Sequence, residues 1–178
     1  MKFTIKHIVA TAIGSAIFFV CARFLSIPVF ANTYLSLQYA VLGFFAAVFG
    51  PLCGMLIGLI GHSLTDLAFG WGIWWSWVIA STVVGLLSGF VIKQGKVEEG
   101  MFAKSDIARF ILGSLIVHGV SWGLVAPVLD ILIYAEPADK VFVQGIIAGA
   151  GNFAFTAIIG TALLAGYART RIKSGSLE

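Results

Sequence analysis

Long apolar segments, separated by short polar or glycine- and proline-containing stretches, make up most of this 178-residue sequence. A helix needs about 20 apolar residues to cross the hydrocarbon core of a bilayer. Only 11% of the residues are charged and 60% are hydrophobic, whereas a soluble domain has about 25% charged residues. We therefore predict one all-α integral membrane domain over residues 1–178. The six segments expected to form transmembrane helices are 5–24, 37–49, 52–69, 74–92, 110–129 and 144–168.

The connections between these segments are short. Gly50 and Pro51 separate the second segment from the third, because proline breaks a helix. The second segment is short for a full span, which leaves a tilted or partial helix as an alternative. The predicted loops are a cytoplasmic loop at 93–108 and external loops at 25–36, 70–73 and 130–143.

The basic residues are distributed unevenly along the chain. With a cytoplasmic N-terminus, nine Lys and Arg residues fall on the inside and only Arg23 and Lys140 on the outside. Cytoplasmic loops carry an excess of Lys and Arg. We therefore expect both termini in the cytoplasm. The nine inside residues are Lys2, Lys6, Lys93, Lys96, Lys104, Arg109, Arg169, Arg171 and Lys173.

The sequence lacks the motifs of common enzyme classes. It has no serine-centred elbow, HExxH motif, Walker A motif or dinucleotide-binding glycine pattern. Cys21 and Cys53 lie in apolar runs without metal-ligand spacing. A net charge of +3 argues against nucleic acid as a partner. We predict no catalytic residue and no metal site, and any ATP hydrolysis must come from another chain.

Ionisable groups at membrane depth are costly and usually face a cavity or a partner. His62 and Asp66 lie one helical turn apart and project from the same face. We interpret them as a hydrogen-bonded pair at the outer mouth of a cavity. A proton relay in a stand-alone secondary transporter or channel is the alternative. Trp122, Asp130 and Asn152 are further candidates in the outer half of the bundle.

Tryptophans are concentrated between the third and fourth segments, at Trp71, Trp74, Trp75 and Trp77. Tryptophan is enriched at membrane interfaces because its ring is apolar and its N–H takes a wet partner. Four tryptophans in seven residues exceed what anchoring one helix requires. We therefore expect some to anchor the helix and others to stack on a planar ligand.

The first external segment is longer than a tight turn and contains Pro28, which blocks helix continuation. Its polar and aromatic side chains include Asn32, Tyr34 and Gln38. Such a segment either covers a pocket or simply connects two helices.

Small residues recur every four positions in several segments. Such spacing places them on one helix face, where backbones approach closely. The sequence predicts tight packing at these pairs and at Ala12 and Ala16 in the first segment. The glycines with this spacing are Gly50/Gly54/Gly58, Gly85/Gly89, Gly119/Gly123 and Gly145/Gly149.

The blocks FGPLCGMLIGLIGHSLTD, WWSWVIAS, WGLVAPVLDILIYAEP and KVFVQG, together with Ala12-x-x-x-Ala16, resemble S components of energy-coupling factor (ECF) transporters. The nearest likeness is to the bacterial riboflavin-type or uncharacterised S components. The resemblance covers nearly the whole chain.

The resemblance implies a six-helix subunit of the bacterial cell membrane that captures a water-soluble vitamin from outside, with cobalamin or riboflavin to be tested first. Its implied partners are a transmembrane coupling subunit and two ABC ATPases that bind ATP. No covalent cofactor is implied. Ala12 and Ala16 would contact the coupling subunit. The expected substrate-binding residues are Asn32, Tyr34, Gln38, His62, Asp66, Trp71, Trp74, Trp75, Trp122, Asp130 and Asn152.

Overall fold

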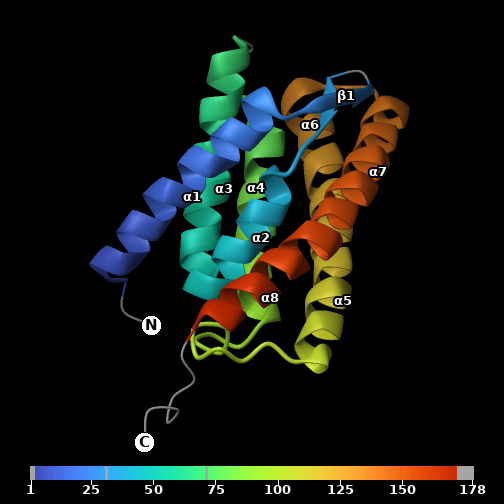
Figure 1. Cartoon of the computed structure of the whole chain (residues 1–178). Helices are drawn as coiled ribbons and strands as arrows, with labels where there is room; N and C mark the ends of the chain where they lie inside the picture. The colour runs from blue at the N-terminus through green and yellow to red at the C-terminus, as the bar shows by residue number, and fades with distance from the viewer. Residues whose placement is uncertain (1–2, 31, 71, 172–178) are drawn as a thin grey trace, which may run out of the picture.

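The computed structural model describes residues 3–30, 32–70 and 72–171 and is almost entirely helical (Figure 1). A short two-stranded hairpin accompanies the helices. The elements are, in chain order, α1 (Ile5–Phe24), β1 (Ile27–Phe30), β2 (Thr33–Leu35), α2 (Gln38–Phe49), α3 (Pro51–Phe69), α4 (Trp75–Val91), α5 (Lys104–Val120), η1 (Ser121–Val125), α6 (Ala126–Tyr134), α7 (Ala138–Phe155), η2 (Thr156–Gly160) and α8 (Thr161–Thr170).

Four helical segments of the described chain are long and apolar enough to cross a membrane. They are α1, α3, the continuous run 104–134 and the continuous run 138–170. α2 and α4 are apolar but shorter. The all-helical architecture expected from the sequence is therefore confirmed, with four helical runs long enough to be membrane spans.

α2 occupies the centre of the bundle, among α1, α3, α4 and α7 (Figure 1). Eight of its twelve residues are buried, among them Tyr39, Leu42 and Phe45. At a rise of 1.5 Å per residue, twelve residues extend only about 18 Å. α2 thus acts as a core helix, and Gly50, with a φ of 96°, turns the chain sharply into α3.

α3 and α4 pack closely because they meet at glycines. A Cβ at Gly54 would collide with the backbone carbonyl of Gly85, and one at Gly58 would collide with the carbonyl of Ser81. The prediction of tight packing is wrong for Gly119 and Gly123, whose Cβ positions face open space. Those two glycines lie on a helix face that no other described element covers.

The fifth helical run is longer than predicted, since it continues past residue 129 to Tyr134. Pro127 does not end it. A proline ring clashes with the carbonyl four residues earlier in a regular α-helix. Here the wider π-helical turn η1 precedes α6 and accommodates Pro127 at the first turn of that helix.

The sixth helical run starts at Ala138 instead of residue 144, so the predicted external loop 130–143 shrinks to residues 135–137. Ala135 ends α6 in a left-handed conformation with a φ of 52°. Pro137 is the N-cap of α7, and Asp139 places an acid in its first turn, where the helix dipole favours it. With these residues at the two helix ends, a tight turn is enough to connect α6 to α7.

The predicted external loop 25–36 contains structure that the sequence did not suggest. β1 and β2 pair antiparallel, with Ile27 opposite Leu35 and Pro28 opposite Tyr34. A side chain at Gly151 would collide with Leu35, so the hairpin lies directly on α7. The hairpin therefore has a fixed position over the bundle.

The predicted cytoplasmic loop 93–108 is also shorter, because α5 already begins at Lys104. Asp106 accepts a hydrogen bond from the backbone N–H of Ala103 over 2.9 Å and pairs with Lys96 over 2.7 Å. Lys6 at the start of α1 pairs with Glu98 in this loop. The loop is thus held against the start of α1, at the end of the molecule opposite the hairpin (Figure 1).

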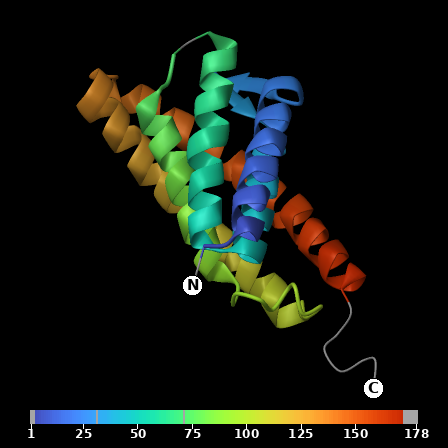
Figure 2. The same ribbon diagram turned by 90° about the vertical axis from the view of Figure 1, so that its left-hand side faces the viewer.

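α1 and α3 lie side by side on one face of the molecule (Figure 2). α1 buries Thr11, Ser15 and Phe18 toward the bundle, whereas Ala12 and Ala16 are exposed on its outer side. The two alanines are therefore available to another chain and are not part of the internal core.

Candidate functional site

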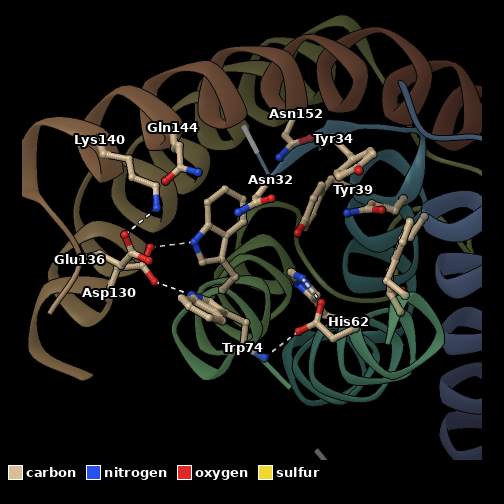
Figure 3. Close-up of a pocket in the computed structure, with 16 residues that line it drawn as sticks. Asn32, Tyr34, Tyr39, His62, Trp74, Asp130, Glu136, Lys140, Gln144 and Asn152 are labelled. Atoms are coloured by element: carbon tan, nitrogen blue, oxygen red, sulfur yellow. Dashed lines mark hydrogen bonds and ion pairs between the residues drawn. The ribbon is translucent and has the colours of Figure 1, made fainter. Parts of the chain in front are cut away.

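A cavity of about 340 Å³ lies beneath the hairpin, at the end of the bundle away from the 92–103 loop (Figure 3). Side chains from the hairpin and from α1, α2, α3, α4, α6 and α7 contribute to its wall. The lining residues are Ala22, Asn32, Tyr34, Gln38, Tyr39, His62, Thr65, Asp66, Phe69, Trp74, Trp77, Asp130, Glu136, Lys140, Gln144 and Asn152.

Asp130 on α6 orients two tryptophans of this wall. Its carboxylate accepts hydrogen bonds from Trp74 Nε1 over 2.7 Å and from Trp77 Nε1 over 2.8 Å. The hydroxyl of Ser76 donates a third hydrogen bond to the same carboxylate. Because Asp130 is buried, it needs such donors in place of water. One carboxylate thereby fastens the start of α4 to α6.

The Trp74 ring is also held by stacking. It lies on the ring of Tyr134, with centroids 4.0 Å apart and planes inclined by 22°. The Tyr134 hydroxyl accepts a hydrogen bond from the backbone N–H of Trp75 over 2.9 Å. Trp74 is thus a rigid part of the wall, fixed by its N–H and by one ring face.

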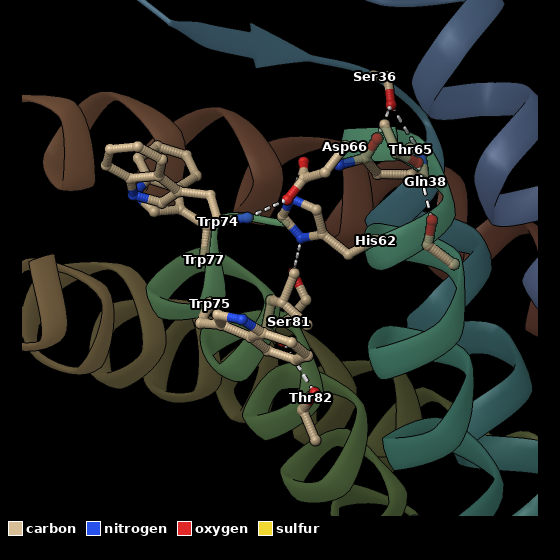
Figure 4. Close-up of polar contacts among 12 residues, drawn as sticks. Ser36, Gln38, His62, Thr65, Asp66, Trp74, Trp75, Trp77, Ser81 and Thr82 are labelled. Atoms are coloured by element: carbon tan, nitrogen blue, oxygen red, sulfur yellow. Dashed lines mark hydrogen bonds and ion pairs between the residues drawn. The ribbon is translucent and has the colours of Figure 1, made fainter. Parts of the chain in front are cut away.

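His62 and Asp66 lie side by side on α3, but they are not the closely hydrogen-bonded pair that we predicted (Figure 4). His62 Nε2 and Asp66 Oδ1 are 3.5 Å apart, which is long for a hydrogen bond. His62 Nδ1 contacts Ser81 Oγ at 2.5 Å instead, and Ser81 Oγ is 2.7 Å from the Tyr39 hydroxyl. Asp66 accepts a hydrogen bond from the backbone N–H of Trp74 over 2.9 Å. Each group is therefore positioned by its own partner from another element.

Amide side chains reach the cavity from the hairpin, α2 and α7. Asn32 occupies the turn between the strands with a φ of 52°, a conformation that asparagine tolerates better than most residues. Asn152 is buried, and its Oδ1 has no hydrogen-bond partner. At the α7 end of the cavity, Lys140 pairs with Glu136 over 2.6 Å. The cavity thus combines aromatic rings with hydrogen-bonding groups, as small-molecule sites do.

Most of the residues predicted to bind substrate converge on this one cavity. Eight of them line it, and these are Asn32, Tyr34, Gln38, His62, Asp66, Trp74, Asp130 and Asn152. Trp71 lies outside the described residues.

Trp75 and Trp122 do not line the cavity, contrary to the prediction. Successive residues on a helix project about 100° apart, so Trp75 turns outward beside Trp74 and its residue surface is 47% exposed. Trp122 is completely buried behind the wall, where its ring meets those of Tyr39 and Trp77 at 5.2 and 5.3 Å between centroids.

Several lining residues were absent from the predicted site, although helical spacing could have identified some. Phe69 follows His62 by seven positions and lies on the same face of α3. Lys140, Gln144 and Asn152 are likewise separated by multiples of four on α7. The other lining residues missing from the expected substrate-binding set are Ala22, Tyr39, Thr65, Trp77 and Glu136. Trp77 was nevertheless one of the four tryptophans among which we expected a ring to stack on a ligand.

Within the ranges that the structure describes, no three His, Cys, Asp or Glu side chains are grouped as they would be around a metal ion.

The sequence matches the family model described as "ECF-type riboflavin transporter, S component" over residues 2–169. The chain belongs to this family. Curated relatives cover almost the same length. A "UPF0397 protein" of Clostridium perfringens is 49% identical over 178 residues, covering 99% of this chain and 96% of its own. One from Lactococcus lactis subsp. cremoris is 47% identical over 176 residues, covering 98% and 97%.

Membership of this family makes the chain an S component, a transport subunit and not an enzyme. Its apolar helices make it a multi-pass membrane protein. S components work with an ECF transmembrane and ATPase module.

Proposed function

We propose that this S component captures a water-soluble vitamin from outside a bacterial cell and delivers it through an ATP-driven complex. The observation that carries the proposal is the cavity of about 340 Å³ beneath the hairpin, with its aromatic and amide lining. Ligand sites measure about 300–1,000 Å³ and combine apolar walls with a few oriented polar groups.

The proposed orientation places the cavity on the outer side of the membrane. Seven described basic residues lie at the end formed by the start of α1, the 92–103 loop, the start of α5 and the end of α8. At the cavity end are Arg23 and Lys140. The positive-inside rule then favours both termini in the cytoplasm, and the proposal takes α2 and α4 as shorter spans beside the four long ones. The seven basic residues are Lys6, Lys93, Lys96, Lys104, Arg109, Arg169 and Arg171.

Riboflavin is the first substrate to test and cobalamin the second. The family description names riboflavin, and the cavity volume lies near the lower end of the usual range. A compact planar ring system suits such a volume better than the far larger corrin ring of cobalamin. Trp74, Trp77 and Tyr34 offer apolar surface for a ring, and the amides offer hydrogen bonds.

The partner-binding surface in this proposal is the outer face of α1. Ala12 and Ala16 are exposed there, and small residues let a partner helix approach closely. Beside them a second hollow of about 520 Å³ lies between α1, α2 and α8, with Val9, Ile13 and Phe44 in its wall. This combination supports docking of a helical coupling subunit that carries two ATPases.

Calorimetry on the purified protein, with riboflavin and cobalamin as ligands, tests the substrate. Uptake into liposomes tests the mechanism. We expect uptake only when the coupling subunit, the ATPases and ATP are present. Proton-coupled uptake by the chain alone would instead support a stand-alone transporter that uses His62 and Asp66 as a relay.

A further inference from the structure

The cavity carries an excess of negative charge. Three carboxylates line it, those of Asp66, Asp130 and Glu136, against one lysine, Lys140. Lys140 and Glu136 neutralise each other across 2.6 Å. Asp66 and Asp130 form no ion pair with any described Lys or Arg. Buried carboxylates normally have a charged partner or a full set of hydrogen bonds.

Asp130 meets that requirement and Asp66 does not. Three N–H or O–H donors surround the Asp130 carboxylate. The backbone N–H of Trp74 donates a hydrogen bond to Asp66 Oδ2. Oδ1 faces His62 Nε2 at 3.5 Å, whereas charge-assisted hydrogen bonds measure about 2.7–2.9 Å. Asp66 is only 3% exposed, so bulk water is a poor substitute.

A second acceptor in the same cavity also lacks a donor. Asn152 Oδ1 has no partner, although the residue is 2% exposed. Asn152 enters the cavity from α7, and His62 enters it from α3 on the other side (Figure 3). Asp66 lines the cavity one turn further along α3. Two buried acceptors on opposing sides of the cavity, Asp66 Oδ1 and Asn152 Oδ1, therefore lack a close donor in the described structure.

We propose that the cavity selects an uncharged or cationic vitamin that donates N–H or O–H groups to Asp66 and Asn152, and rejects forms carrying a phosphate or carboxylate. This inference rests on the proposed function and adds the charge class of the substrate. An anion between these walls would meet unneutralised carboxylate charge in a region of low dielectric constant, where repulsion is strong.

Matched pairs of ligands test the charge rule by calorimetry on the purified protein. The pairs are riboflavin with riboflavin 5′-phosphate, and thiamine with thiamine monophosphate. We expect the unphosphorylated member of the binding pair to bind at least about tenfold more tightly, equivalent to about 1.4 kcal/mol. The Asp66→Asn variant should narrow that ratio, because the repelling charge is gone. Equal affinities for both members, or an unchanged ratio in the variant, would overturn the inference.

A second arm needs no ligand and compares two variants of the empty protein. Asp66→Asn keeps an acceptor for the backbone N–H of Trp74 while removing a charge without a counter-ion, so we expect a higher melting temperature. Asp130→Asn is the matched control: in either orientation its amide NH2 would face at least one of the two indole N–H donors, so we expect a lower melting temperature. A lower melting temperature for Asp66→Asn would overturn the inference. If no vitamin binds, the proposed function fails, and this arm still decides whether Asp66 lacks a partner.

Discussion

Trp122 Nε1 donates a hydrogen bond to His118 Nδ1 over 3.1 Å, one turn earlier in the same helical run. Because Nδ1 accepts, the ring proton of His118 sits on Nε2, which donates to Thr156 Oγ1 over 3.0 Å. Trp122 belongs to the π-helical turn η1 and Thr156 to η2. The two irregular turns are therefore joined through one buried histidine behind the cavity wall.

This link predicts that Trp122 contributes to stability and makes no direct contact with the ligand. Trp122→Phe removes the donor to His118 and leaves a gap in the core, so we expect a loss of about 1–3 kcal/mol in unfolding free energy. Thermal unfolding of the detergent-solubilised protein measures it. Trp75→Phe is the control, because its ring lies toward the surface. Equal melting temperatures for the two variants would contradict the structural role of Trp122.

The close approach of α3 and α4 predicts different outcomes for two Gly→Ala substitutions. An added Cβ at Gly54 collides with the Gly85 carbonyl, so Gly54→Ala should destabilise by about 1–3 kcal/mol. A Cβ at Gly119 meets open space, and alanine favours the helix by about 0.8–1.0 kcal/mol over glycine. Gly119→Ala should therefore be neutral or stabilising. Equal destabilisation in unfolding measurements would show that α3 and α4 do not meet at Gly54.

The exposed position of Ala12 and Ala16 predicts a separation of two functions. Replacing both by leucine should abolish co-purification of the coupling subunit while leaving vitamin affinity unchanged, because neither alanine lines the cavity. Ala22 lies on the same helix but lines the cavity, so Ala22→Leu should weaken vitamin binding and leave co-purification of the coupling subunit unchanged. Pull-down and calorimetry on each variant measure the two functions. Loss of vitamin binding in the first variant would place these alanines in the site or the core.

The hairpin turn allows backbone and side-chain roles of Asn32 to be distinguished. Glycine readily adopts the φ of 52° found at this position, so Asn32→Gly should preserve the turn and remove only the amide. We expect weaker vitamin binding with little change in melting temperature. The branched side chain of valine disfavours this φ, so Asn32→Val should lower both the vitamin affinity and the melting temperature. Unchanged affinity in Asn32→Gly would remove Asn32 from the binding residues.

The sequence by itself determined that the chain is helical and enters a membrane, because apolar composition and segment length follow directly from the bilayer. It also identified eight of the lining residues, since ionisable and amide side chains are costly at membrane depth unless they face a cavity or a partner, and aromatic rings suit a planar ligand. Helical spacing extended to α7 could have added Lys140 and Gln144.

Only the tertiary structure decided which side chains meet. The predicted fifth segment ended at residue 129, but the π-helical turn before Pro127 lets the helical run continue to Tyr134. This brings Asp130 on α6 within reach of both indoles. Trp75 and Trp122 resembled Trp74 in sequence, yet one turns outward and the other is buried behind the wall. The physical reason is that the type of a residue fixes which interactions its side chain can make. The direction in which that side chain points depends on the rotation of its helix and on contacts with residues distant in sequence.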